Sequence, residues 1–288
     1  MKMSSKPKIA FCFLLYDTVL HRNIWEDFFS QDKNCTHNIY SHVKKITKNT
    51  PPWIRENKTR TVKTGWCEEN LIFAWVQMLK KAMKNKENKY FALLSGECIP
   101  LFTYPQTYKM ITRSKKSRVN ISTDVAIDAG DVYSLTGLLY ADQWVILNRK
   151  CAQLMIDLKD SAEGKAWRKK TKKMMYLTAQ GEPSCNYKIM SPSNDCGYVE
   201  ALCPDEIYPV NWLIHKLGRR SSKGFKKEIR DIPATYTYWD PESEEPHPEK
   251  FTYNKMKKYK RKICKSKAIF GRKFYPKAAR KLALTCGK

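Results

Sequence analysis

The stretch Lys8-Ile9-Ala10-Phe11-Cys12-Phe13-Leu14-Leu15 determines the fold class of this chain. It is a continuous apolar run of strand length, and it ends at the polar pair Tyr16-Asp17. A run of this length without alternation is typical of a strand whose two faces are both buried, as in a parallel sheet. The run therefore predicts the first strand of a sheet that lies inside the molecule.

The segments that follow complete a strand–helix–strand unit. Apolar residues at helical spacing from Leu20 to Phe29 predict a helix, and residues 37–43 predict a second short strand. Such a start predicts an α/β sheet with right-handed crossovers. Further predicted elements are a surface connection over 44–63, helices over 68–84, 107–112 and 161–178, and strands over 90–94 and 234–239.

The strongest bulk property is a formal net charge of +26. A charge of this size predicts attraction to polyanions. Basic clusters occur at Lys165–Lys173, Arg219–Lys227 and Lys255–Lys273, and aromatic residues interleave in the last one. No zinc-finger spacing, RNA-binding aromatic motif or basic heptad repeat accompanies them, so a solvated lysine-rich surface is the commoner explanation. We therefore do not expect nucleic acid as a partner.

The chain shows no sequence signal for a membrane or for secretion. No run of about 18 apolar residues exists, which predicts no transmembrane segment. The basic start is followed by only a short apolar run and no small-residue cleavage site, so no signal peptide is expected. These features predict a soluble cytoplasmic protein, and the Lys- and Asn-rich composition suits a viral or microbial source.

The ten cysteines show no Cys-x-x-Cys pair and no zinc-binding spacing. Cys12 and Cys98 lie in apolar runs, where a free thiol acts as a small hydrophobic side chain. We therefore expect mostly reduced thiols, as in a cytosolic protein. A bridge between Cys185 and Cys196, or between Cys196 and Cys203, is left open.

Two adjacent carboxylates in Cys203-Pro204-Asp205-Glu206-Ile207-Tyr208 are the first candidate site residues. Proline fixes its own φ and holds the preceding residue extended, so the acids are predicted at a loop end or in a first helical turn. A helix over 207–217 can follow, with Pro209 in its first turn. A carboxylate held there can accept a proton from a substrate hydroxyl. The alternative is that the acids only favour the helix N-terminus electrostatically.

Glu97 follows the predicted strand 90–94, next to Gly96. It would present a carboxylate at the carboxyl end of a strand, which is where ligands bind in open α/β sheets. The alternative is a turn residue that accepts hydrogen bonds from local amides. The chain has no glycine-rich phosphate loop, which argues against a P-loop enzyme or a Rossmann dehydrogenase.

Arg272-Lys273 is the candidate anion site, because Phe270 and Phe274 bracket it. Two buried aromatic rings would fix the backbone and direct both cations to one place, which suits a diphosphate. The alternative is a plain solvated pair of cations.

The segments that carry a family resemblance run from about Lys8 to Phe274. They are Ile9–Leu14, Trp25–Phe29, Ile39–His42, Gly65-Trp66, Leu93–Leu101, Asp142-Gln143-Trp144, Pro204–Tyr208, Thr237–Trp239, Pro246–Pro248 and Phe270–Phe274. In this order and spacing the chain resembles the core-2/I-branching β-1,6-N-acetylglucosaminyltransferases. This is glycosyltransferase family 14, which includes xylosyltransferases and plant relatives.

The resemblance implies a GT-A-like nucleotide-sugar-binding fold, an α/β architecture with a mostly parallel central sheet flanked by helices. It implies one domain over residues 1–288, with a donor-binding half over about 8–120 and an acceptor and catalytic half over about 121–288. The implied reaction is inverting transfer of N-acetylglucosamine or xylose from a UDP-sugar to a hydroxyl of a glycan or glycoprotein acceptor, forming a β linkage. No metal or other cofactor is implied, and the chain contains no Asp-x-Asp pair.

Site residues are carried over by motif. The resemblance implies that Glu206 is the general base and that Arg272 and Lys273 hold the donor diphosphate in place of a metal. It also assigns donor or acceptor contacts. These are Glu97 beside the donor, Trp239 against the acceptor sugar, His42 at the end of the strand that binds uridine, and Asp205 next to the base.

The chain departs from the family pattern at three points. It shows no anchor, stem or secretory signal, Ala141-Asp142 stands where plant relatives have Gly-Ser, and a second phosphate-binding cation has only Lys250 as a candidate. The competing hypothesis is a basic protein that binds nucleic acid or an anionic glycan without catalysis.

Overall fold

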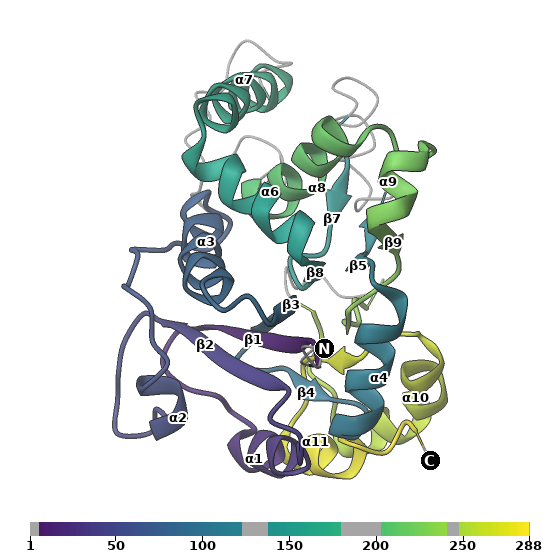
Figure 1. The fold of residues 1–288 in the computed structure, drawn as a ribbon. Helices are drawn as coiled ribbons and strands as arrows, with labels where there is room; N and C mark the ends of the chain where they lie inside the picture. Colours follow the sequence, from purple (N-terminus) through teal and green to yellow (C-terminus); the bar gives the residue numbers. More distant parts are fainter. Residues whose placement is uncertain (1–5, 123–137, 180–202, 241–247, 288) are drawn as a thin grey trace, which may run out of the picture.

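A computed structural model describes residues 6–122, 138–179, 203–240 and 248–287 (Figure 1). Its centre is a six-stranded sheet in the order β2-β1-β3-β8-β5-β9. The strands are β1 (Lys8–Leu15), β2 (His37–Val43), β3 (Asn88–Ser95), β5 (Ser117–Val119), β8 (Ile146–Asn148) and β9 (Ile229–Asp231). Only β8 runs antiparallel to its neighbours within this sheet. The predicted α/β fold with a mostly parallel sheet and flanking helices is confirmed.

Both faces of β1 are buried, as its apolar run predicts. Ala10 and Cys12 face one layer, and these small side chains let the helices approach the sheet closely. This layer consists of α3 (Asn70–Met83), α6 (Arg149–Asp160), α7 (Ala162–Ala179) and α8 (Pro204–Leu217). Phe11 and Phe13 face the opposite layer, which contains α1 (Arg22–Ser30) and α4 (Tyr104–Ser114). The sheet is thus the middle layer of three (Figure 1).

A second, three-stranded sheet organises the C-terminal part of the chain. It has the order β10-β11-β4, formed by β10 (Thr235–Tyr236), β11 (Phe270–Gly271) and β4 (Ile99–Pro100). A third apolar cluster joins this sheet to α10 (Tyr253–Lys265) and α11 (Pro276–Leu282). A Cβ at Gly271 would lie 3.1 Å from the Phe274 ring, so a glycine allows this tight packing. The pairing of β11 with β4 brings residue 272 next to the turn that carries Glu97.

The remaining elements are short. They are α2 (Pro52–Arg55), which lies inside the predicted surface connection, α9 (Lys223–Glu228), and the paired strands β6 (Ile121–Ser122) and β7 (Tyr140–Ala141). The strand predicted over 234–239 is shorter than expected, because β10 pairs only with the two-residue strand β11.

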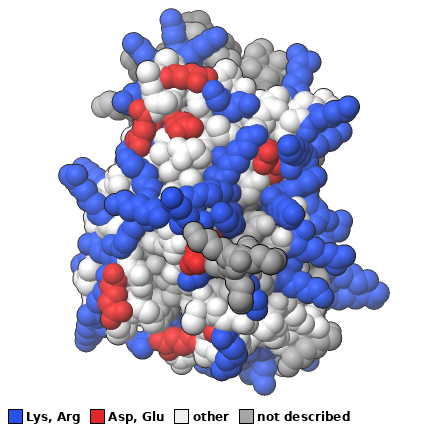
Figure 2. Space-filling model, viewed as in Figure 1, with Lys and Arg blue, Asp and Glu red and all other residues white. Residues whose placement is uncertain are grey.

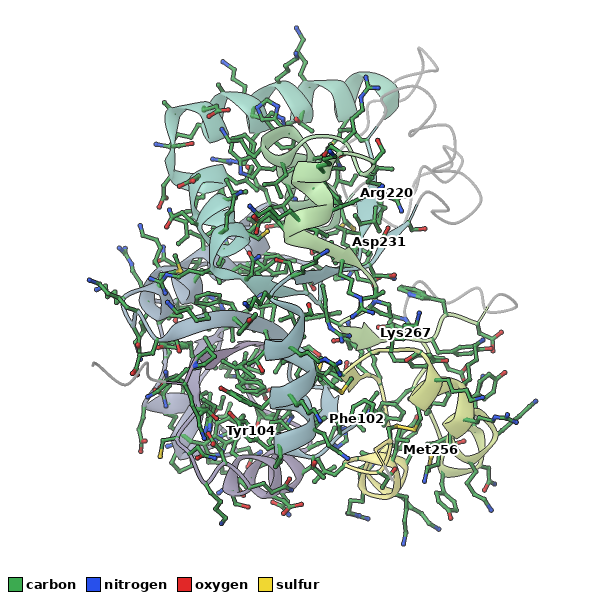
Figure 3. The ribbon with its side chains drawn as sticks, turned by 45° about the vertical axis from the view of Figure 1, so that its right-hand side comes forward. Phe102, Tyr104, Arg220, Asp231, Met256 and Lys267 are labelled. Atoms are coloured by element: carbon green, nitrogen blue, oxygen red, sulfur yellow. A yellow bond between two sulfur atoms is a disulfide. The ribbon has the colours of Figure 1, made fainter. Side chains whose placement is uncertain are left out.

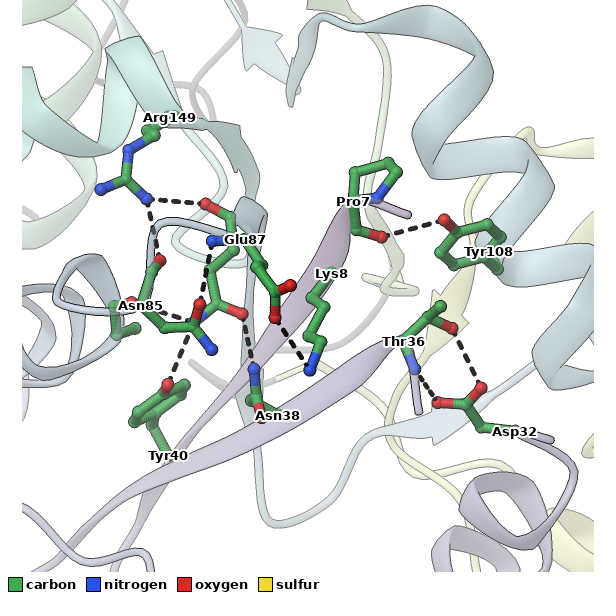
Figure 4. Close-up of polar contacts among 12 residues, drawn as sticks. Pro7, Lys8, Asp32, Thr36, Asn38, Tyr40, Asn85, Glu87, Tyr108 and Arg149 are labelled. Carbon is green, nitrogen blue, oxygen red and sulfur yellow. Dashed lines mark hydrogen bonds and ion pairs between the residues drawn. The ribbon is translucent and has the colours of Figure 1, made fainter. Parts of the chain in front are cut away.

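Polar side chains close the amino-terminal edge of β1, β2 and β3 (Figure 4). Asn88 donates hydrogen bonds to the hydroxyl of Tyr40 and the carbonyl of Ala82. Arg149 donates to the carbonyls of Met83, Asn85 and Asn88, between the end of α3 and the start of β3. Lys8 pairs with Glu87 at 3.1 Å. These contacts fix one edge of the sheet, and the carboxyl ends of the same strands are left for the candidate site.

Two disulfides correct the expectation of mostly reduced thiols. Cys67 is bonded to Cys203, and Cys264 is bonded to Cys286. The bond to Cys67 excludes the Cys196–Cys203 bridge, while Cys185 and Cys196 themselves lie outside the described residues. No spacing of the cysteines signals these pairs, because their partners are brought together only by the fold. Cys12 and Cys98 are free and buried, as predicted.

None of the helices in the described ranges is long and apolar enough to cross a membrane.

Candidate active site

Glu97, Arg272 and Lys273 meet at the carboxyl edge of the sheet. Glu97 Oε2 lies 3.6 Å from Arg272 Nη2 and 3.4 Å from Lys273 Nζ. The three side chains retain 27%, 14% and 20% exposure respectively, so they are sheltered but still reachable from solvent. Both distances exceed a hydrogen bond, which means that one carboxylate oxygen shares two cations loosely. An anionic ligand could therefore compete with Glu97 for both cations.

The backbone and the ring of a buried tryptophan position Arg272. Its N–H donates to the carbonyl of Tyr236 at 2.9 Å, and its guanidinium carbon lies 4.9 Å from the centroid of the Trp144 ring. Arginine stacks well on an indole face, and the contact restricts a long side chain. The Nε atom of Arg272 is buried and has no hydrogen-bond partner among the described residues.

The two candidate carboxylates lie in the first turn of α8. This helix begins at Pro204, three residues earlier than expected, because the Cys203 carbonyl accepts from the N–H groups of Glu206 and Ile207. Proline at the first helical position loses no hydrogen bond, since that N–H has no partner within a helix. The earlier start places Pro209 in the second turn, so its expected place in the first turn is wrong.

Burial makes both carboxyls much weaker acids than usual. Asp205 accepts a 2.7 Å hydrogen bond from Nε2 of Gln143, and burial raises its pKa to about 7. The pKa of Glu206 is raised to about 8, mainly by burial and also by the nearby carboxylates of Asp205 and Asp142. A hydrogen bond from Tyr140 and the positive charge of Arg272 act in the opposite direction. Glu206 therefore lies within the electrostatic field of Arg272, although 66 positions separate them in the sequence.

The segment from β7 to β8 joins the acids to the cations. The Tyr140 hydroxyl donates a hydrogen bond to the Glu206 side chain and accepts one from the Cys203 backbone N–H, and burial raises the pKa of this hydroxyl. Asp142 accepts a 2.9 Å hydrogen bond from Nδ2 of Asn120, and burial raises the pKa of Asp142 while Arg272 lowers it. This one segment thus carries groups that act on Glu206, Asp205 and Arg272.

Asn211 holds β7 against α8. Its Oδ1 accepts from the Leu139 N–H at 2.9 Å, and its Nδ2 donates to the carbonyls of Leu139 and Ile207 at 2.7 Å each. The amide therefore pairs with Leu139 in both directions, as a neighbouring strand would. Because Tyr140 follows Leu139 and Glu206 precedes Ile207, this arrangement sets the tyrosine beside the glutamate.

The Cys67–Cys203 disulfide anchors the start of α8. Cys203 is the residue before Pro204, and Cys67 precedes α3 on the donor-side half of the chain. The Cα atoms lie 4.5 Å apart. The bond therefore holds the first turn of α8 next to the Gly65-Trp66 segment.

Two predicted site residues lie outside this cluster. His42 is fully buried at the end of β2, and because of this burial its pKa is lowered. Its Nε2 accepts a hydrogen bond from the Val62 N–H at 2.9 Å. Trp239 is 55% exposed beyond β10. Lys250 lies 4.8 Å from the Tyr275 ring centroid and lowers the pKa of His21, which also interacts with Glu97.

Within the described ranges, no group of three or more His, Cys, Asp or Glu side chains is arranged to hold a metal ion.

Sequence reasoning missed the residues that support the acids and cations. Tyr140 and Asn211 lie in no motif, and Trp144 was matched to the family without a role. The motif Asp142-Gln143-Trp144 was the one available signal, because the family resemblance already included it.

Comparison with known proteins points to the same family as the sequence pattern. Residues 9–129 match the family model described as Core-2/I-Branching enzyme. Over 161 residues the chain is 24% identical to Glycosyltransferase BC10 from Oryza sativa subsp. japonica, covering 52% of this chain and 40% of that protein. The chain thus aligns with less than half of the rice protein. The family match includes His42 and Glu97 and ends before Glu206, Arg272 and Lys273. Over residues 9–129, the chain is thus similar to the Core-2/I-Branching enzyme family.

Proposed function

We propose that this protein is a metal-independent inverting glycosyltransferase. It moves a sugar, N-acetylglucosamine or xylose, from a UDP-sugar to a hydroxyl of a glycan or glycoprotein acceptor, and it forms a β linkage. The family match and the likeness to a rice glycosyltransferase support the reaction class. The donor, the acceptor and the independence from metal are parts of the proposal.

The observation that carries the proposal is the closeness of Glu206 to Arg272. A carboxyl with a pKa of about 8 is a better proton acceptor at neutral pH than an ordinary glutamate, once it is ionised. The cation that acts electrostatically on Glu206 is Arg272. Together with Lys273 it lies close to one carboxylate oxygen of Glu97. A base and an anion site therefore face one region of the molecule, as a single displacement requires.

These groups account for the proton, the bonds and the leaving group of the proposed reaction. Glu206 takes the proton from the acceptor hydroxyl while the acceptor oxygen forms a bond with C1 of the donor sugar on the face opposite UDP. The bond between C1 and the phosphate oxygen breaks, and its electron pair leaves with UDP. Arg272 and Lys273 stabilise the charge that develops on the diphosphate. Electrostatic groups of this kind each contribute about 2.7–4 kcal/mol to transition-state stabilisation in other enzymes.

The other predicted residues have supporting roles in the proposal. Glu97 lies beside the donor, where its carboxylate yields the two cations to the diphosphate. Asp205 and Gln143 form a hydrogen-bonded pair next to the base and orient the acceptor. Trp239 lies against the acceptor sugar, and His42 supports the backbone that contacts uridine.

Thermal unfolding with UDP in the presence of EDTA tests the proposal. A ligand that binds only the folded state stabilises it by about 2.7 kcal/mol at 100 times its dissociation constant, so UDP should raise the melting temperature of the wild-type protein. The variant with Arg272→Ala and Lys273→Ala should lose this shift. No shift with UDP, or a shift that appears only after manganese is added, would contradict the proposed donor site.

The competing function is a basic binding protein without catalysis, and the net charge of +26 favours it. Acceptor-dependent release of UDP from a UDP-sugar separates the two functions. The predicted cytoplasmic location and viral or microbial source stay predictions, and the two disulfides weigh against a permanently reducing environment.

A further inference from the structure

The C-terminal segment of the chain carries a one-sided charge that the proposed reaction does not use. Residues 250–288 contain fifteen Lys and Arg residues and no Asp or Glu. Arg272 and Lys273 account for two of these cations. Most of the others lie on two helices, α10 and α11.

These helices form one rigid surface. Met256 and Ile263 of α10 and Leu282 of α11 are buried in the same apolar cluster, and the Cys264–Cys286 disulfide links the two segments. Their outer sides form what we name the basic helix surface. On α10 it consists of Lys257, Lys258, Lys260, Arg261, Lys262 and Lys265, which are all exposed. On α11 it continues with Lys277, Arg280 and Lys281.

The surface projects from the edge of the molecule. Lys and Arg side chains protrude along the right-hand edge in Figure 2, where α10 lies in Figure 1. Figure 3 shows the helix that contains Met256 at the same edge, with side chains directed away from the molecule.

The charges on this surface lack acidic partners within the described part of the chain. Elsewhere exposed lysines pair with acids, as in Lys80–Asp160, Lys150–Glu228 and Lys216–Glu163. On α10 only the inner Lys255 has such partners, Asp240 and Glu249. The nine cations of the basic helix surface form no ion pair among the described residues.

This arrangement costs stability. Like charges three or four positions apart on a helix destabilise it by about 0.2–0.5 kcal/mol per pair, and α10 contains several such pairs, including Lys257 with Arg261 and Lys258 with Lys262. The helix forms because Thr252 caps it and Met256 and Ile263 are buried. A polyanion along the surface would relieve this repulsion.

The surface begins at the segment that carries Trp239. Lys255 and Lys262 lie 4.8 Å and 5.8 Å from the ring centroid of Tyr238, whose hydroxyl lies 3.3 Å from that of Tyr259. Trp239 is the next residue, and the proposed function places it against the acceptor sugar. A chain that extends from the acceptor site past Trp239 would therefore reach α10.

The tyrosines of the surface separate an acidic glycan from a single-stranded nucleic acid. Bases stack on open aromatic faces. Here Lys257 and Lys277 lie over Tyr253, and Lys258 and Lys262 lie over Tyr259. These two rings of α10 present lysine instead of an open face, so the helices offer charge and hydrogen-bond donors. The exposed ring of Trp239 lies beside them, and the proposed function assigns it to the acceptor sugar. Within α10 and α11 no large apolar side chain is exposed for insertion into a lipid bilayer, and the exposed ring of Tyr275 before α11 is covered on one face by Lys250.

From these observations we infer that the basic helix surface binds an acidic glycan, a chain bearing sulfate, phosphate or uronate groups, that continues from the acceptor site. The inference rests on the proposed function, because it takes Trp239 as an acceptor residue. It names the substrate class as an acceptor whose extension is negatively charged.

Binding of a heparin octasaccharide, measured by isothermal titration, tests the inference with two matched variants. The first variant has Lys257→Glu, Lys258→Glu and Arg261→Glu on α10. The second has Lys169→Glu, Lys170→Glu and Lys173→Glu on α7, which reproduces the same spacing and charge change on exposed residues at the opposite end of the molecule (Figure 1). Neutral dextran of the same length is the uncharged control.

We expect the α10 variant to bind heparin at least tenfold more weakly than the wild-type protein, and the α7 variant to bind within about threefold of it. Wild-type binding should weaken at least tenfold between low and physiological salt, and dextran should not bind. Equal losses in both variants, or tighter binding of single-stranded DNA or phosphatidylserine vesicles than of heparin, would overturn the inference. If the α10 variant does not fold, the same three positions changed to Gln give the same comparison.

UDP binding is measured on the same samples. Both variants should bind UDP alike, because neither touches Arg272 or Lys273. Loss of heparin binding in the α10 variant with UDP binding retained supports the inference on the basic helix surface and does not test the donor site. Absence of UDP binding in the wild-type protein contradicts the proposed function instead.

Discussion

The guanidinium of Arg272 lies over the indole ring of Trp144, with its central carbon 4.9 Å from the ring centroid. Trp144 is buried and belongs to the segment that also supplies Asp142 and Tyr140. The contact therefore ties the orientation of this cation, the proposed ligand of the donor diphosphate, to the segment that acts on Glu206. A lysine at position 272 would keep the charge but lose the planar stacking and the fork of donors.

Arg272→Lys should weaken UDP binding by about tenfold, since cation–π contacts in partly desolvated sites contribute on the order of 0.5–2 kcal/mol. Isothermal titration of UDP measures this change. Arg280→Lys, an exposed position on α11, is the matched control and should leave the affinity unchanged. Equal UDP affinities for Arg272→Lys and the wild-type protein would show that only charge matters at this position.

Glu206→Gln should abolish sugar transfer while UDP still binds, because an amide cannot accept the acceptor proton. In the wild-type protein the transfer rate should rise with pH through a midpoint near 8, where half of the Glu206 carboxyl is ionised, and level off at higher pH. A pH–rate profile with UDP release as the readout checks this. Sugar transfer by the Glu206→Gln variant would show that Glu206 is not the general base.

Tyr140→Phe provides a finer test of the same carboxyl. The hydroxyl of Tyr140 lowers the pKa of Glu206, so its removal should move the rise in rate to higher pH. A lower plateau with an unmoved profile would instead indicate that Tyr140 acts only on packing.

Protein stability should fall as pH rises from about 4.5 to about 8, and it should level off above that pH. The folded protein holds Asp205 and Glu206 protonated up to about pH 7 and pH 8, whereas the unfolded chain releases these protons near their model values of 3.8 and 4.5. The folded state thus binds more protons in this interval, and the free energy of unfolding decreases with pH. His21 and His42, whose pKa values are lowered, act in the opposite direction below about pH 6.5.

Urea unfolding at the two ends of this pH interval measures the effect. The variant with Asp205→Asn and Glu206→Gln should lose most of the slope, because neither amide titrates. An unchanged slope in that variant would mean that other groups govern the pH dependence.

Asn211→Ala should lower the free energy of unfolding by about 2–4 kcal/mol. It removes three hydrogen bonds and leaves the buried backbone groups of Leu139 without their side-chain partners. Urea unfolding checks the value, and Asn254→Ala on the exposed side of α10 should stay within about 0.5 kcal/mol. A loss below about 1 kcal/mol would show that β7 does not depend on this amide.

The sequence predicted the elements whose signal is local. The apolar run of β1, the helical spacing of α3 and the two phenylalanines around Arg272 each depend on neighbouring residues, and the structure reproduces them. The predicted start of α8 at residue 207, with Pro209 in the first turn, is three residues too late. The structure tolerates this proline in the second turn, where it can remove one internal hydrogen bond.

The supporting residues of the site could not be found in this way. Asn211 is an ordinary helical residue until Leu139 lies beside it, and Cys67 pairs with a cysteine 136 positions away. Asn211 meets Leu139 only when α8 packs against β7. Cys67 meets Cys203 only when the loop before α3 lies against the start of α8. The candidate base and cations were accessible from sequence because each forms a compact motif, whereas what orients them is assembled from distant segments.

The Cys67–Cys203 bond closes a ring of backbone that contains α3, three of the six strands of the central sheet and both helices α6 and α7. A peptide bond cut anywhere inside that ring would not free either product, because the sulfur–sulfur link would still join them. Nicked protein would migrate as one species on a non-reducing gel and separate into two only after thiol treatment. The start of the helix with the proposed base would thus stay attached to the donor-side half even in a broken chain.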